Sequence, residues 1–334
     1  MRLAVIADRA GRWVGSGTVA GIACSRVAEV RMAGLSRHDH GAVGVLMPEN
    51  GGRYPYGNSL LIRGSGETVL VDPSLAVGEQ GPAGIEGGER VDAIVVSHGH
   101  EDHLAGVHRY PDVPVYAHDA DLAAVRSVDT LVEGYGLPAD RTGEFRAELV
   151  RDFGLVDRPD ATGLADGTRL DLGDRTVTVV HLPGHTAGHC GLLIEPDDFF
   201  FVGDIDLSRF GPYYGDTGSD LEAFEASIER CLQVQARWYG TFHHKGVVTG
   251  AQQFAEQLRA YRDVIGTREQ RLLEFLGEPR TLDEVVAHRI VYRPHVDLPW
   301  ADTVERRTSE QHLARLVADG TCEIVEPGRF RRAR

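Results

Sequence analysis

The chain has 334 residues, of which 42% are hydrophobic and 25% are charged, and its formal net charge is −15. The length predicts two domains, and the acidic balance argues against a broad basic surface for nucleic acid or anionic membranes. No run approaches the ~20 apolar residues of a membrane-spanning helix. The four cysteines form no C-x-x-C pair, so we expect a reduced, cytoplasmic setting without disulfides or a cysteine-based zinc site.

Residues 1–45 have the weakest pattern, and we expect an N-terminal segment there, either an extension or an edge strand around residues 27–32. His38 and His40 lie in a polar stretch outside any metal-binding pattern. We therefore expect both of them on the surface.

A dense group of imidazoles follows a predicted buried strand. Residues 91–96 are short, β-branched and almost continuously apolar, which is typical of a strand covered on both faces. In an extended segment His98 and His100 point the same way and can reach one cation, whereas Asp102 and His103 begin a helical turn and face a second point. Imidazole and carboxylate together suit zinc or a similar divalent metal. The alternative is a solvated polar loop, which seldom concentrates histidines in this way.

The segment after this loop has mixed signals. Residues 113–117 predict another strand, and residues 118–128 predict a helix. His118 is better placed to begin that helix than to bind a metal. Residues 129–165 have no clear period, and we expect a surface insertion beside the cleft.

The strand pattern resumes at residues 169–182 and 190–202. Each of these runs ends close to a candidate ligand, His185 or Asp204, and sheet proteins commonly place their sites at strand ends. His189 lies four residues past His185 and is either a further ligand or a hydrogen-bond partner of one.

The C-terminal third of the chain is predicted to be mainly helical. Capping boxes, which mark helix starts, begin at Ser219, Thr249, Thr267 and Thr281. The character of the sequence changes after Gly266, where we place a domain boundary. A further helix and a hairpin at residues 321–332 complete the predicted tail.

Together these motifs resemble the metallo-β-lactamase superfamily, with its His-x-His-x-Asp-His pattern at residues 98–103. The resemblance covers roughly residues 45 to 265 and includes these segments: 58–62, 69–72, 181–186, 200–204 and 242–247. It implies an α/β fold, an αββα sandwich of two packed sheets with helices outside and metals at one edge. We therefore expect three parts: an N-terminal segment (1–45), a catalytic domain (46–266) and a small winged-helix-like domain (267–334). The last part either closes the active site, which we favour, or binds DNA.

The resemblance also implies these metal ligands: His98, His100, Asp102, His103, His185, Asp204 and His244. His98, His100 and His185 would bind the first metal, and Asp204 would bridge to the second. Counting back from Val247 favours His244 over His243 as the last ligand. Around the ligands we expect residues that support them or contact the substrate: Asp72, His189, His243, Lys245, Tyr213 and Tyr214.

The implied activity is hydrolysis of an ester or thioester in a small or carrier-linked acyl substrate. Two cations ~3.5 to 4 Å apart lower the pKa of a shared water toward ~7, so a bridging hydroxide is available at neutral pH. Asp102 and Asp204 would be the catalytic carboxylates, and two zinc ions are the expected cofactors, with iron or manganese as substitutes. The alternatives are a nuclease or phosphodiesterase, a lactonase, and an iron-dependent oxidoreductase of the persulfide dioxygenase kind. We expect neither a membrane nor a nucleic-acid partner, and the chain is compatible with a homodimer.

Overall fold

The structure is a computed structural model that describes residues 34–86 and 90–333. The edge strand expected at residues 27–32 lies outside the described residues. Among the described residues, no helix combines the length and the apolar character needed to cross a bilayer.

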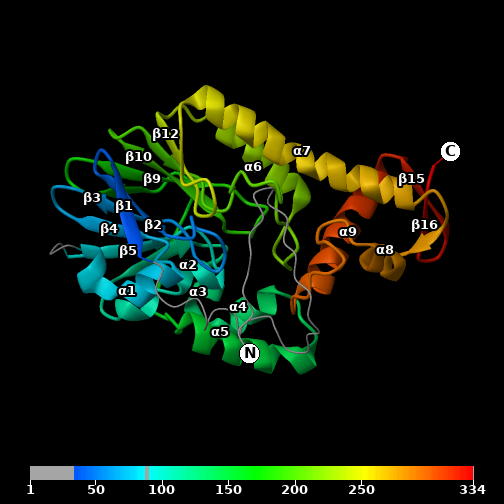
Figure 1. Cartoon of the computed structure of the whole chain (residues 1–334), viewed down its shortest axis with the longest axis horizontal. Helices are drawn as coiled ribbons and strands as arrows, with labels where there is room; N and C mark the ends of the chain where they lie inside the picture. Colours follow the sequence, from blue (N-terminus) through cyan, green and yellow to red (C-terminus); the bar gives the residue numbers. More distant parts are fainter. Residues whose placement is uncertain (1–33, 87–89, 334) are drawn as a thin grey trace.

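Two β-sheets packed face to face form the main body (Figure 1). The seven-stranded sheet follows chain order: β1 (Leu35–His40), β2 (Val43–Pro48), β3 (Ser59–Arg63), β4 (Thr68–Val71), β5 (Ala93–Val96), β6 (Val115–His118) and β7 (Thr162–Leu164). The six-stranded sheet has this order: β13 (Val247–Thr249), β12 (Trp238–Gly240), β11 (Phe199–Phe201), β10 (Cys190–Glu195), β9 (Thr176–His181) and β8 (Arg169–Asp171). Alternate apolar side chains of both sheets, such as Val45, Ile62, Val179 and Leu192, form one buried layer between them.

Helices cover both outer faces, so the expected αββα sandwich is confirmed (Figure 1). The first sheet carries these short helices: α1 (Leu75–Glu86), α2 (Glu101–Leu104), the 3-10 turn Val107–Arg109, α3 (Leu122–Arg126), α4 (Val128–Gly134) and α5 (Ala139–Phe153). The second sheet carries α6 (Leu221–Gln233) and the first part of α7 (Ala251–Phe275).

The segment expected to be an irregular insertion is helical. Residues 129–165 contain most of α4 and all of α5, and the latter buries Phe145, Leu149 and Phe153. Those three residues are four apart, which places them on one helical face. That spacing was the signal that the prediction missed. His118 ends β6 instead of beginning a helix, and α3 starts only at Leu122.

Of the predicted helix starts, only the last has its capping box. Thr281 and Glu284 make both reciprocal bonds at the start of α8 (Leu282–His288). Asp220 instead of Ser219 caps α6, and no side chain caps α7. The start expected at Thr267 is wrong, because α7 continues through that position and keeps Ile265, Arg268 and Leu272 buried on one stripe.

The C-terminal unit has a small core of its own. It consists of the end of α7, α8, α9 (Ala301–Ala318) and a three-stranded sheet in this order: β14 (Arg280–Thr281), β16 (Arg329–Arg332) and β15 (Cys322–Glu326). Its buried residues include Leu276, Val285, Leu313 and Leu316. Figure 1 shows α7 extending from the sandwich to this unit. The expected boundary at Gly266 therefore falls inside a helix, and the boundary at residue 46 falls inside β2.

Candidate metal centre

The candidate ligands lie in loops that leave neighbouring strands at one edge of the sandwich. His98 and His100 follow β5, His185 follows β9, Asp204 follows β11 and His243 follows β12. The fold thereby brings together side chains that are up to 145 positions apart, from His98 to His243. Two groups among them are arranged so that each could hold a metal ion.

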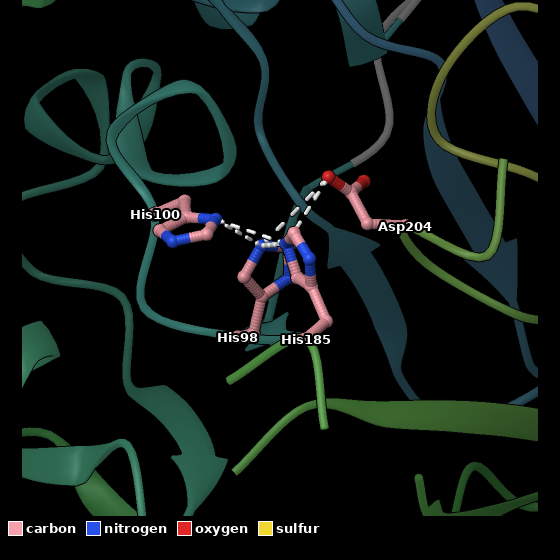
Figure 2. Close-up of side chains that lie close together, drawn as sticks. All are labelled: His98, His100, His185 and Asp204. Atoms are coloured by element: carbon pink, nitrogen blue, oxygen red, sulfur yellow. Dashed lines mark hydrogen bonds and ion pairs between the residues drawn. The ribbon is translucent and has the colours of Figure 1, made fainter. Parts of the chain in front are cut away.

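The first group is His98, His100, His185 and Asp204, drawn in Figure 2. His98 Nε2 lies 2.9 Å from His100 Nδ1 and 3.1 Å from His185 Nε2, and the last two atoms are 3.0 Å apart. Asp204 Oδ2 is 3.4 Å from His185 Nε2. Ring nitrogens that converge to this extent fit around a single cation at the ~2.0 to 2.1 Å distance of zinc–nitrogen bonds.

The outer nitrogen of each of these rings has a protein partner. His98 Nδ1 is 3.2 Å from Ser97 Oγ, and His185 Nδ1 is 3.0 Å from the Tyr213 carbonyl oxygen. His100 Nε2 is 2.6 Å from Asp216 Oδ2. Such partners fix ring orientation and leave the inner nitrogen as the electron-pair donor.

The second group is Asp102, His103 and His243. His243 Nε2 is 3.0 Å from Asp102 Oδ2, and His103 Nε2 is 3.2 Å from Asp204 Oδ1. The Asp204 carboxylate therefore lies between the two groups: Oδ1 is near His103, and Oδ2 is 3.4 Å from His185 Nε2 and 3.7 Å from His243 Nε2. Asp72, predicted to support a ligand, accepts at 2.9 Å from His103 Nδ1.

Polar atoms in this region are buried without a hydrogen-bond partner in the described part of the chain. They are Asp102 Oδ2, His103 Nε2 and Asp204 Oδ1. These atoms are close to one another, but the contacts at 3.0 and 3.2 Å are not hydrogen bonds. Buried polar atoms are nearly always paired, so three ligand-type atoms in this state fit a bound divalent cation.

The surroundings give the two groups different electrostatics. Burial, together with the neighbouring histidines, holds the pKa of His98 well below its usual value, which keeps the ring neutral. Burial would also lower the pKa of His103, but Asp204, Asp72 and Asp102 raise it well above the usual value. The same carboxylates attract a cation, whose binding displaces the proton.

His243, not the favoured His244, lies in the second group. Phe242 stacks on the His103 ring at 3.6 Å, and the next side chain turns inward, so that His243 Nδ1 is 2.9 Å from the Gly52 carbonyl oxygen. His244 has a positive φ of 57° and points away, with Nε2 3.7 Å from Asp206 Oδ2. The candidate group thus contains the residue one position before His244, which the count back from Val247 selects.

A cavity of about 260 Å³ opens beside both groups. Tyr213 lines it, as expected, but Tyr214 is buried and pairs with His312 Nε2 at 2.9 Å. Lys245 is exposed and is absent from the cavity lining among the described residues.

Several residues that organise the site were missed or given no specific partner by the sequence. Asp121 accepts from Gly99 N at 3.0 Å and from Gly188 N at 2.6 Å, and so ties the two histidine loops together. His189 accepts from Asp204 N at 3.0 Å, the supporting role expected for it. Asp121 carries no local motif, because its partners are distant in sequence.

The C-terminal unit contributes to the cavity wall through residues 290–300, here called the strap, which connect α8 to α9. The strap supplies Tyr292, Leu298 and Trp300 to the lining. The buried Glu305 accepts from the backbone N–H groups of Ile290, Val291 and Tyr292, the last at 2.6 Å.

Helix α7 holds another part of the wall. The fully buried Arg268 donates to the carbonyl oxygens of Phe210 and Pro212, and its guanidinium lies 5.3 Å from the Phe210 ring centroid. The tail therefore contacts the cleft through the strap and α7, and no residue of the hairpin β15–β16 is among the lining residues in the described chain.

Comparison with known proteins identifies the family of this chain. A family model described as the metallo-beta-lactamase superfamily matches residues 53–244. The chain belongs to the metallo-β-lactamase superfamily. Its relatives in this superfamily include the human acyl-coenzyme A thioesterase MBLAC2, 28% identical over 204 residues that cover 54% of this chain and 68% of the relative. The hydroxyacylglutathione hydrolase of Yersinia pestis is 28% identical over 147 residues, 42% of this chain and 43% of that protein. The chain is accordingly a metallo-hydrolase with a divalent metal site.

Solved structures of the superfamily share the fold. A family protein from Thermus thermophilus has a TM-score of 0.65 at 22% identity and covers 87% of this chain and 99% of its own. A beta-lactamase domain protein from Burkholderia ambifaria has a TM-score of 0.66 at 20% identity, covering 90% and 94%. Each of these matches covers a larger share of the chain than residues 1–266 make up, so the structural likeness includes part of the C-terminal unit.

Proposed function

We propose that this metallo-hydrolase uses two divalent ions, preferably zinc, to cleave an ester or thioester bond of a small or carrier-linked acyl substrate. The observation that carries the proposal is the placement of Asp204, whose carboxylate lies between the two groups, 3.4 Å from His185 Nε2 and 3.2 Å from His103 Nε2. The relatives support the substrate class, since their names describe hydrolysis of acyl groups carried by coenzyme A or glutathione.

The proposed ligands are His98, His100 and His185 for one ion, and Asp102, His103 and His243 for the other, with Asp204 shared. Two ions held there would supply Lewis acidity, activating water as the nucleophile and polarising the substrate carbonyl. Asp216 and Asp72 orient His100 and His103 from behind. Asp102 faces both His243 and the cavity and is positioned to orient the attacking water.

A nuclease is the less favoured alternative. Proteins that bind phosphodiesters usually present arginine or lysine to the phosphate oxygens. Among the residues that line the cavity in the described chain, none is a lysine or an arginine. An anionic backbone would therefore meet only the metal ions and several carboxylates.

The decisive experiment is a hydrolysis panel on the metal-loaded chain, with thioesters, esters, lactones, phosphodiesters and β-lactams. Thioester and ester hydrolysis that is lost in Asp204→Ala supports the proposal. Turnover of phosphodiesters alone would replace it with the nuclease alternative. Oxygen uptake by iron-loaded protein, without hydrolysis, would replace it with the oxidoreductase.

A further inference from the structure

We propose that the cavity selects a neutral, apolar acyl group about as large as hexanoyl or phenylacetyl, and that the strap limits its length. This inference rests on the proposed function, because it names the substrate class of the same site. It follows from the chemistry of the cavity wall, from the absence of lysine and arginine among its described lining residues and from its volume.

The wall is aromatic, and four of the five tyrosines among its described lining residues donate their hydroxyl protons to protein partners. Tyr54 donates to Glu101 Oε1 at 2.9 Å, and Tyr135 donates to the other oxygen of the same carboxylate. Tyr213 donates to Asp216 Oδ1 at 2.8 Å, and Tyr261 donates to the Asp204 carbonyl oxygen at 3.1 Å. Each hydroxyl has one proton to donate, so these residues present ring surface to a substrate instead of hydrogen-bond donors.

The wall also lacks a counter-charge for an anionic acyl group. No lysine or arginine is found among the lining residues that the structure describes. Arg268, behind Phe210, donates to two backbone carbonyl oxygens. Glu101 and Asp206, in contrast, add carboxylates to the lining. A carboxylate at the far end of the acyl chain, away from the proposed metal ions, would therefore lose its water without gaining a lysine or arginine as partner, which is strongly unfavourable.

The volume sets the size of the group. A water molecule occupies ~30 Å³ in the liquid, so the cavity of about 260 Å³ holds roughly nine non-hydrogen atoms on this scale. The reacting carbonyl and its sulfur occupy part of this space. What remains suits a chain of about six carbons or one aromatic ring.

The strap would limit the length because its Trp300 lines the cavity and packs against two of the wall tyrosines. Its ring centroid lies 6.3 Å from that of Tyr54 and 5.7 Å from that of Tyr135. Leu298, from the same strap, is a second lining residue. Removing either side chain would extend the cavity without touching the candidate ligands.

The test uses N-acetylcysteamine thioesters that differ only in the acyl group: acetyl, butanoyl, hexanoyl, dodecanoyl and succinyl. We expect kcat/KM to rise about fourfold per methylene from acetyl to hexanoyl, then to fall for dodecanoyl. Succinyl, which replaces the methyl of butanoyl with a carboxylate, should react at least about tenfold more slowly than butanoyl. Equal rates for these two, or a flat series, would overturn the inference.

Two strap variants test the length limit. Leu298→Ala and Trp300→Ala should shift the optimum toward dodecanoyl, whereas His295→Ala, an exposed residue of the same strap, should not. Circular dichroism shows whether each variant folds, and Leu298→Ala keeps the test valid if Trp300→Ala does not. An unchanged chain-length profile in a folded Leu298→Ala protein contradicts the role of the strap.

Binding without turnover separates the two proposals. Alkyl methyl ketones of the same chain lengths cannot be hydrolysed, and calorimetry on metal-free protein should give their tightest binding at the hexanoyl length. If no thioester is cleaved but the ketones keep this order, the proposed function fails and the cavity preference stands. If thioesters are cleaved but the ketones bind equally at all lengths, the cavity preference fails alone.

Discussion

The carboxylate of Asp216 joins the aromatic wall to the metal centre. Its Oδ2 lies 2.6 Å from His100 Nε2, and its Oδ1 accepts from the Tyr213 hydroxyl at 2.8 Å. Because the His100 ring donates its outer N–H to Asp216, its Nδ1 is left to face His98 and His185. One buried carboxylate thus orients a candidate ligand and a wall residue together.

The first prediction concerns this contact. Asp216→Asn replaces the anionic acceptor of the His100 N–H with a neutral one, and it should weaken zinc binding about 10-fold to 100-fold. Competition with a chromophoric chelator measures the affinity. Asp220→Asn is the matched control, because Asp220 caps α6 and asparagine caps a helix equally well. Unchanged affinity in Asp216→Asn would show that the contact is not needed to orient the ring.

The second prediction compares the adjacent histidines. Elemental analysis of metal-replete protein should find about two divalent ions per chain, as in dinuclear hydrolases. His243→Ala should reduce this to about one, whereas His244→Ala, whose ring points away from the group, should retain both. Asp204→Ala should lose one or both ions. The reverse result for the histidines would restore the ligand favoured by the sequence.

The third prediction concerns the support of the strap. Glu305 is fully buried, and Glu305→Ala leaves the backbone N–H groups of Ile290, Val291 and Tyr292 without their acceptor. An unpaired buried donor costs ~1 to 3 kcal/mol, so we expect a loss of about 3 kcal/mol in the free energy of unfolding. Urea denaturation measures it, with Glu310→Ala, exposed on the same helix, as the control.

Loss of the Glu305 contacts should also alter the cavity wall formed by the strap, without changing metal binding. The variant should raise KM for the preferred thioester while its metal content stays that of the wild type. A fall in metal content with unchanged KM would mean that Glu305 acts on the centre by another route.

The fourth prediction is a pH dependence. Burial lowers the pKa of His312 to about 3, whereas the unfolded chain binds this proton near pH ~6.5. Between these values the unfolded state holds more protons, so this residue makes stability fall as the pH falls, by about 1.4 kcal/mol per pH unit. Its contribution is complete above the unfolded pKa.

The comparison partner is His312→Gln, whose side-chain oxygen can still accept from the Tyr214 hydroxyl. Urea titrations of both proteins in the presence of chelator, from pH 7 down to pH 4, give the difference in their free energies of unfolding at each pH. The histidines of the metal centre are present in both proteins, so their contribution to the pH dependence cancels in this difference. The wild type should lose stability more steeply than the variant. Parallel curves would indicate that His312 is protonated in the folded state.

The parts of the site that were predictable from sequence depend on local geometry. His98, His100, Asp102 and His103 come together because a buried strand ends directly before them. The alternation of an extended chain sets where His98 and His100 point, and the helical turn of α2 sets where Asp102 and His103 point. His185 and Asp204 were found in the same way, at the ends of predicted strands. The sandwich itself was predicted from the resemblance that these motifs carry.

The parts that were missed depend on tertiary contacts. His243 and His244 differ by one position, and the choice between them follows from the stacking of Phe242 and a positive φ at His244. Asp121 has no local signal, since its partners are Gly99 and Gly188. Nor did any local pattern predict that α7 continues through Gly266, because the stripe that stays buried contacts two different cores.

The unbroken course of α7 bears on how substrate enters. Its first half packs on the sandwich, and its last turns belong to the C-terminal core, with no interruption over 25 residues. A continuous helix contains no hinge of the kind that lets lids swing in other enzymes. We therefore expect the strap and the metal centre to move as one rigid body. Acyl groups would then enter a cavity whose walls keep their positions, and the fixed side chains of the strap would limit the chain length.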